Sequence, residues 1–306
     1  MDILRYAAFT TDPEGGNPAG VVLDATGLDD AAMLAVAADL GYPETAFLTR
    51  DRNGAAGERD YDVRYFSPKA EVPFCGHATI ATAVALAERI GAGELLFRTR
   101  AGEVPVDVEA ESDGALRATL TSVEPRVDPV SEPDVAEALR LLRWSADDLD
   151  PALPPRIAYA GARHLVLAAA TRGRLAELAY DFDGLAAYMD ARELTTLQLV
   201  WREDASTFHV RDPFPVGGIV EDPATGAAAA AFGAYLRELG LLARTAGPST
   251  VLTLRQGEDL GRPGVLRVEL REGDRRVRVS GTAVPTTAAP VGAAPVTAAA
   301  VTPPLG

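Results

Sequence analysis

The chain has 306 residues, enough for two domains of ordinary size, and its formal net charge is −15. This acidity argues against general affinity for nucleic acid or for anionic membranes. There is no apolar run of about 18 residues and no basic-then-apolar leader, so we expect a cytoplasmic protein that does not span a membrane. Cys75 is the only cysteine, which excludes an intramolecular disulfide.

In the first half of the chain, the hydrophobic pattern predicts several strands and two helices. Gly41 and Gly91 follow the two helix patterns directly, as helix-ending residues do. In chain order, we expect strands at 1–9 and 21–24, a helix at 28–40, strands from 44 and at 61–68, a helix at 78–90, and strands near 94–100, 103–109 and 115–122.

The second half repeats this order of elements. We expect two strands around Gly161, one or two helical segments in 174–192, strands at 196–203 and 206–214, a second Ala-rich helix after 221, and three alternating strands in 250–281. A Pro-rich and charged stretch at 123–133 marks the junction. The predicted organisation is therefore a domain at 1–125, a domain at 126–283 and a flexible Ala/Pro-rich tail at 284–306.

One motif occurs in both halves. Residues 74–90 and 221–240 each place Gly and Thr before a long run of Ala and other small apolar residues. Such a run predicts a helix, and its apolar circumference favours burial inside a curled sheet over a place on the surface. A helix N-terminus offers unpaired N–H groups and partial positive charge, which suit an anion. We therefore predict that the helix starts at Gly76 and Gly226 face each other across one cleft.

Several sequence blocks occur in an order that is similar to a known family. The blocks are GNPAGVV (16–22), PETAFL (43–48), RYFSPKAEVPFCGHAT (64–79), EDPATGAA (221–228), QGEDLGRPG (256–264) and VSGTAV (279–284). Together they resemble the phenazine-biosynthesis PhzF-like family, a branch of the diaminopimelate epimerase superfold. The resemblance implies an α+β fold with two similar domains. Each would be a curled, mostly antiparallel sheet around a central Ala-rich helix, with the active site between them.

The resemblance also implies the roles of individual residues. Glu44 matches the acid/base glutamate that moves a proton between carbons of the substrate, and His77 and Asp222 match the supporting polar residues. The positions that would bind substrate are Asn17, Gly76, Thr225 and Gly226. Ala227 departs from the family, where Ser is common. Because that hydroxyl would help to hold a substrate carboxylate, its absence weakens the case for the phenazine precursor as the substrate.

Each of these residues also has a simpler interpretation. Glu44 read alone is a surface glutamate at a strand start, and His77 is a helix-start histidine with a structural hydrogen bond. Asp222 read alone is an N-cap that stabilises its helix by about 1 kcal/mol. Arg262 either holds an anion or braces a turn. Cys75 is interpreted as packing or cleft lining.

The sequence favours a cofactor-independent isomerase or epimerase that acts on a small carboxylate-bearing metabolite by general acid/base catalysis. Racemisation by two thiols is excluded because the chain has one cysteine. A thiol hydrolase or acyl transferase using Cys75 and His77 is the alternative, although side chains at i and i+2 diverge on most backbones. A non-catalytic small-molecule binding protein is a third reading. A homodimer is the base-rate expectation.

The sequence predicts neither a metal nor a nucleotide cofactor. Only three histidines occur, and no cluster of Cys, His and Asp has the spacing of metal ligands. The GGNPAG segment lacks the lysine of a phosphate-binding loop, and no GxGxxG follows a strand.

Overall fold

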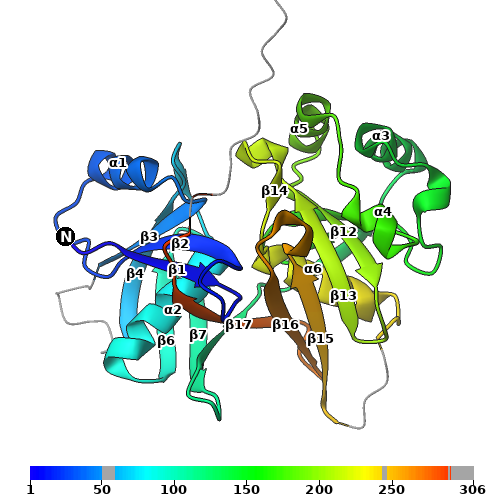
Figure 1. Ribbon diagram of the computed structural model, residues 1–306. Coiled ribbons are helices and arrows are strands. Elements are labelled where there is room, and N and C mark those ends of the chain that lie inside the picture. Colours follow the sequence, from blue (N-terminus) through cyan, green and yellow to red (C-terminus); the bar gives the residue numbers. More distant parts are fainter. Residues whose placement is uncertain (50–58, 243–246, 289, 291–306) are drawn as a thin grey trace, which may run out of the picture.

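The computed structural model describes residues 1–49, 59–242, 247–288 and 290 (Figure 1). The first half contains β1 (Leu4–Ala8), β2 (Asn17–Val22), α1 (Asp30–Leu40), β3 (Glu44–Thr49), β4 (Asp60–Phe66), β5 (Glu71–Val72), α2 (Gly76–Ile90), β6 (Gly93–Thr99), β7 (Gly102–Ala110) and β8 (Leu116–Thr121). The second half contains β9 (Arg126–Pro129), α3 (Glu132–Leu142), η1 (Ala146–Asp148), β10 (Arg156–Tyr159), β11 (Arg163–Ala168), α4 (Arg172–Ala176), α5 (Phe182–Asp190), β12 (Thr196–Arg202), β13 (Thr207–Pro213), η2 (Pro215–Gly217), β14 (Glu221–Asp222), α6 (Gly226–Glu238), β15 (Ser249–Gln256), η3 (Glu258–Leu260), β16 (Gly264–Arg271) and β17 (Val277–Pro285).

Strand pairing repeats along the chain. In the first half β2 pairs in parallel with β3, β3 antiparallel with β4, and β4 in parallel with β6, after which β6, β7 and β8 pair antiparallel. The second half follows the same sequence of pairings from β11 to β17. The order of elements expected from the sequence therefore recurs, in an α+β fold with a mixed sheet.

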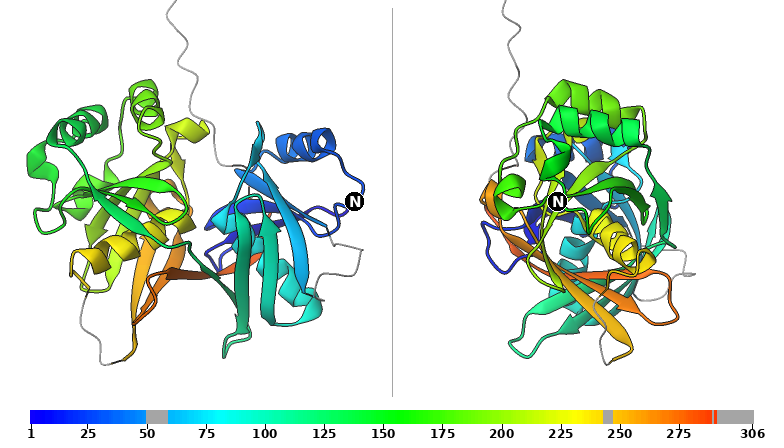
Figure 2. Two further views of the ribbon diagram at one scale, coloured as in Figure 1. Left: turned by 180° about the vertical axis from the view of Figure 1, so that it is seen from behind. Right: turned by 90° about the vertical axis from the view of Figure 1, so that its right-hand side faces the viewer.

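Both Ala-rich segments form helices enclosed by strands (Figures 1 and 2). Every residue of α2 from His77 to Ala87 is buried, and α2 contacts β1, β2, β3, β7, β8 and β17. Helix α6 contacts β9, β10, β11, β12, β16 and β17. Small side chains allow this enclosure because a strand can approach Ala more closely than Leu on every side of the helix.

Strand β17 connects the two halves. It pairs with β16 of the second half and with β1 and β8 of the first. The strand continues to Pro285, and Ala288 is buried, with its carbonyl accepting a hydrogen bond from Tyr42 Oη at 2.8 Å. The expected tail therefore starts too early at residue 284, because pairing with β1 orders its first residues. Residues 289 and 291–306 lie outside the described part of the chain. The domain division at residue 125 stays a prediction.

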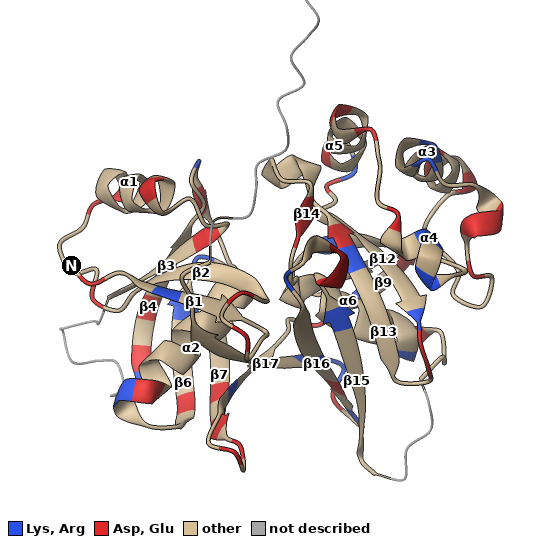
Figure 3. Cartoon of the chain, in the orientation of Figure 1, with Lys and Arg blue, Asp and Glu red and all other residues tan. Residues whose placement is uncertain are grey.

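Helix α3 falls at the end of the stretch that the sequence predicted only as a junction. Ser131 caps the helix by accepting from the Asp134 N–H, and Pro133 lies in its first turn. Helices α3, α4 and α5 share a second apolar core with strands β11 and β12. No helix within the described ranges is long and apolar enough to cross a membrane. Figure 3 shows acidic and basic residues interspersed over the strands and outer helices of both halves.

Candidate functional site

The N-termini of the two buried helices meet. A Cβ atom built on Gly76 would lie 3.7 Å from Cα of Gly226, and α2 and α6 are in contact. Neither residue before these glycines, Cys75 at α2 or Thr225 at α6, caps its helix with a side-chain hydrogen bond. The two helix starts therefore lie together as predicted, whereas the cleft predicted between them stays a prediction. Two positive helix ends converge on one place, which favours a bound or developing negative charge there.

Glu44, Cys75 and His77 form one cluster beside the start of α2. Glu44 is the first residue of β3, and its Oε2 lies 3.4 Å from His77 Nε2 and 3.5 Å from Cys75 Sγ. Cys75 Sγ is 3.3 Å from His77 Nδ1. The expectation that the Cys75 and His77 side chains diverge is wrong, because Cys75 has extended backbone before the helix and its side chain turns back toward the ring.

Burial controls the protonation of this cluster. The Glu44 side chain is 15% exposed, and burial together with the charge of Asp222 raises the pKa of Glu44 to about 8. Burial lowers the pKa of His77 to about 3, so its imidazole is neutral at pH 7. Burial and the charge of Glu44 raise the pKa of the Cys75 thiol well above its usual range. A neutral imidazole beside a neutral thiol is not the ion pair that an activated cysteine nucleophile requires.

A chain of side-chain hydrogen bonds connects the two halves at this point. Asn17, on β2, donates from Nδ2 to Asp222 Oδ1 at 2.7 Å and to the carbonyl of Ala224 at 3.1 Å, and the same nitrogen is 3.2 Å from His77 Nδ1. The amide nitrogen carries two hydrogens, and the two shorter contacts, to Asp222 Oδ1 and to the Ala224 carbonyl, account for both. Asn17 thus links β2 of the first half to the segment that leads into α6.

Asp222 does not cap α6. Its Oδ2 accepts from the Thr225 hydroxyl at 2.6 Å, and its Oδ1 accepts from Asn17. Burial raises the pKa of Asp222 to about 6, although the bonds from Thr225 and Asn17 oppose this shift. The interpretation of Asp222 as an N-cap is therefore wrong, because its carboxylate is turned toward Asn17 and the first half of the chain.

Gln256 and Asp212 belong to the same network, and sequence reasoning missed both. Gln256 Oε1 accepts from the Thr225 N–H at 3.0 Å, and its Nε2 donates to the Asp222 carbonyl and to Asp212 Oδ2, both at 2.9 Å. Asp212 is fully buried, and burial raises the pKa of its carboxyl well above the usual range. Gln256 is the first residue of the QGEDLGRPG block. The family resemblance of this block was therefore the signal that could have pointed to Gln256.

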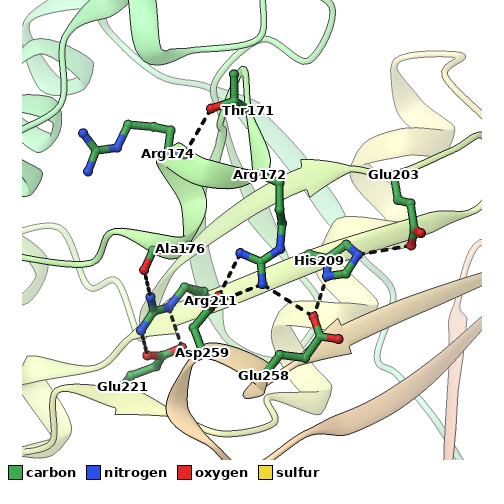
Figure 4. Close-up of polar contacts among 10 residues, drawn as sticks. All are labelled: Thr171, Arg172, Arg174, Ala176, Glu203, His209, Arg211, Glu221, Glu258 and Asp259. Carbon is green, nitrogen blue, oxygen red and sulfur yellow. Dashed lines mark hydrogen bonds and ion pairs between the residues drawn. The ribbon is translucent and has the colours of Figure 1, made fainter.

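Ion pairs hold the segments around this network in place (Figure 4). Arg211 and Glu221 form a buried bidentate pair with N–O distances of 3.0 and 2.5 Å, and Arg211 also donates to the Ala176 carbonyl. Arg172 pairs with Asp259 at 3.0 Å, which fastens the η3 turn to α4. Outside the figure, Arg262 Nε donates to the carbonyl of Gly16, so its role as a turn brace is supported.

The other two histidines lie away from the cluster. His164 is buried in β11, with Nδ1 2.8 Å from the Thr196 hydroxyl. His209 lies on β13 between two carboxylates, with Nδ1 2.5 Å from Glu258 and Nε2 3.1 Å from Glu203 (Figure 4). Both histidines therefore have structural partners, as the sequence predicted.

The sequence-based reason for expecting no metal site does not hold. Glu44, Cys75 and His77 each offer a ligand atom, and these atoms lie within 4.8 Å of one another. The sequence spacing does not reveal this cluster, because Glu44 lies on β3, 31 positions before Cys75 at the start of α2.

Comparisons with known proteins identify the family of this chain. A family model described as "Phenazine biosynthesis-like protein" matches residues 6–289. An uncharacterized isomerase of Salmonella typhimurium is 34% identical over 298 residues, covering 92% of this chain and 95% of the relative. Trans-2,3-dihydro-3-hydroxyanthranilate isomerase of Pseudomonas fluorescens is 30% identical over 280 residues, covering 90% and 94%. The solved structure of a predicted epimerase from Pseudomonas aeruginosa superposes with a TM-score of 0.79 at 28% identity, covering 92% and 95%.

Proposed function

Because the chain belongs to the phenazine biosynthesis-like protein family, whose curated relatives are isomerases, we propose that it moves a proton on a small carboxylate-bearing substrate without a cofactor. The observation that carries this proposal is the position of Glu44. Its carboxyl group lies beside the start of α2 and next to His77, where α2 and α6 converge. A carboxyl group beside two anion-binding helix starts suits proton transfer at a carbon whose negative charge needs stabilisation.

In the proposed mechanism Glu44 removes a proton from a carbon next to an unsaturated or carbonyl group and returns it to another carbon. A pKa of about 8 supports this role, because both protonation states of Glu44 are then populated near neutral pH. His77 is neutral at pH 7, and its Nε2 lies 3.4 Å from Glu44 Oε2, where the ring can orient Glu44 or exchange a proton with the substrate.

The helix starts would hold the substrate carboxylate and the charge that develops in the transition state. The described residues contain no lysine or arginine paired with Glu44 or Asp222, so backbone N–H groups at Gly76 and Gly226 are the candidates for this role. Ala227 offers no hydroxyl at the second helix start. We therefore propose a carboxylate substrate other than the one named for the Pseudomonas fluorescens relative.

Replacing Glu44 by Gln tests the proposal. The amide keeps the size of the side chain but neither removes nor delivers a proton. General acid/base catalysis contributes about 10²–10⁴-fold, so we expect Glu44→Gln to lower turnover by that factor. The measurement is deuterium incorporation into product in D₂O, by mass spectrometry, over a panel of small carboxylates.

The matched control is Glu109→Gln, an exposed glutamate on β7 that should leave incorporation unchanged. Undiminished incorporation by the Glu44→Gln enzyme would contradict the role of Glu44.

A further inference from the structure

The hydroxyl of Thr225 lies between Asp222 and Gln256, directly before α6. It donates to Asp222 Oδ2 at 2.6 Å, and Gln256 Nε2 lies 3.1 Å from the same hydroxyl oxygen. An amide nitrogen cannot accept the hydroxyl proton, so this proton points to Asp222. The Thr225 N–H donates to Gln256 Oε1, and the Thr225 carbonyl accepts from the Ala229 N–H, both at 3.0 Å. Thr225 therefore has no hydrogen left to donate to a substrate.

The bond from Thr225 acts on a buried carboxylate. Asp222 is 7% exposed, and its two oxygens accept from different donors, Oδ2 from Thr225 and Oδ1 from Asn17. Burial raises the pKa of Asp222 to about 6, and both bonds oppose this shift. We propose that Thr225, aligned by Gln256, is a positioning residue that holds Asp222 in its ionised form, and that it does not bind the substrate.

Asp212 is the competing acceptor for the Thr225 hydroxyl. It lies opposite Asp222 in the pairing of β13 with β14, and it also faces this hydroxyl. Burial, together with the charges of Asp222 and Glu221, raises the pKa of Asp212 well above its usual range. Its carboxyl group is therefore neutral while Asp222 is charged. Because a hydroxyl donates more strongly to a carboxylate than to a neutral carboxyl group, the bond from Thr225 favours the charge on Asp222.

The charge of Asp222 matters because it acts on the proposed base. Together with burial, this charge raises the pKa of Glu44. Thr225 therefore influences Glu44 through Asp222, and this consequence rests on the proposed function. The other titratable or charged groups around Asp222 are Cys75, His77 beyond Asn17, Asp212, and Glu221 with its partner Arg211.

The titration of Asp222 can be followed without any substrate. Carbon-13 NMR of protein labelled at the aspartate carboxyl groups reports the protonation of each aspartate, and Asp222→Asn identifies the Asp222 signal by its loss. We expect a midpoint near pH 6 in the unaltered protein. Thr225→Val keeps the shape of the side chain without the hydroxyl and should raise this midpoint by about one pH unit, as should Thr225→Ala. Thr225→Ser keeps the hydroxyl and should return the midpoint to the value of the unaltered protein.

Thr196→Val is the matched control. Thr196 is also buried, and its hydroxyl bonds to His164 at 2.8 Å, so this variant removes a buried hydroxyl that does not contact Asp222. It should leave the Asp222 midpoint unchanged. A midpoint that stays in place in Thr225→Val, or that moves equally in Thr196→Val, would overturn the proposal.

Steady-state kinetics separates the two possible roles of Thr225. A residue that acts through Asp222 should lower kcat, by about tenfold in Thr225→Val, with KM nearly unchanged. A higher KM with an unmoved Asp222 midpoint would instead make Thr225 a substrate-binding residue. The titration does not depend on turnover, so an unmoved midpoint leaves the acid/base role of Glu44 standing. Likewise, undiminished deuterium incorporation by Glu44→Gln would leave the bond from Thr225 to Asp222 standing.

Discussion

At the scale of single residues, Glu44 is held in a position that favours its neutral form. The carboxyl group gains little from its neighbours, since the bond from Cys75 only partly offsets burial and the charge of Asp222. A residue that is costly to charge in the folded protein but needed in its charged form is typical of functional sites. The same property predicts how the stability of the protein depends on pH.

Glu44→Gln should stabilise the protein at alkaline pH. In the unfolded chain the carboxyl ionises near its ordinary value of 4.5, whereas in the folded protein it stays protonated up to about pH 8. Unfolding therefore releases a proton between these values, and stability falls as pH rises through this window. Above pH 8 the variant should be more stable by up to about 5 kcal/mol, and near pH 4.5 the difference should become small.

Urea unfolding of both proteins at pH 5 and pH 9, with a chelator present, provides the measurement. Glu109→Gln serves again as the exposed control and should show no such trend. A stability difference between Glu44→Gln and the unaltered protein that does not change with pH would show that Glu44 ionises normally in the fold.

Residue identities at the site were predictable to different degrees. Family resemblance pointed to Glu44, His77 and Asp222, and the structure brings these three into one network. The contact between Cys75 and His77 was not predictable, because it depends on the backbone dihedral angles just before α2. Gln256 was missed because an amide at a strand end becomes informative only when its buried partners are known.

At the scale of elements, α6 packs so closely on two strands that one position cannot hold a methyl group. A Cβ atom on Gly233 would lie 2.7 Å from Val268 Cγ1 and 3.3 Å from Val277 Cγ1. The branched valine side chains have few rotamers in which to make room. Glycine in the middle of this helix is therefore required by packing on β16 and β17.

Gly233→Ala should destabilise the protein despite the better helix propensity of alanine. Overpacking costs about 1–3 kcal/mol, and the propensity gain returns about 1 kcal/mol, so the net loss is on the order of 1 kcal/mol. Gly173→Ala in α4 is the control, since its Cβ would meet only Thr171 Oγ1 at 3.9 Å. That variant should be as stable as the parent or slightly more so in urea unfolding. Equal gains in both variants would contradict the packing argument.

The elements were largely predictable because hydrophobic periodicity and helix-ending glycines are local signals. Gly41, for example, ends α1 in a left-handed conformation that suits glycine. Helix α3 carried a local signal too, the Ser131 cap followed by Pro133, but the charged residues around it were read as a junction. The pairing of β17 with β1 was not predictable from local sequence, because it joins residues almost a chain length apart.

At the scale of the whole molecule, the two halves share a continuous structure. The apolar core that contains α2 also contains α6, and β17 carries the hydrogen-bonded network from one half to the other. Asn17 adds a buried polar link from β2 to Asp222. Two units joined in this way lose many contacts if only one of them unfolds, which favours a single cooperative transition.

The positions of the tryptophans make this cooperativity measurable. Trp144 and Trp201, the only two in the chain, both lie in the second half, whereas far-UV circular dichroism reports on helices of both halves. Ile80→Ala removes a fully buried side chain from α2, in the first half, and should cost about 2–5 kcal/mol. If the halves unfold together, this variant shifts the tryptophan fluorescence curve in urea by the same amount as the dichroism curve. If the dichroism curve shifts while the fluorescence curve stays unchanged, the two halves unfold independently. In that case the pairing of β17 with strands of both halves does not couple their unfolding.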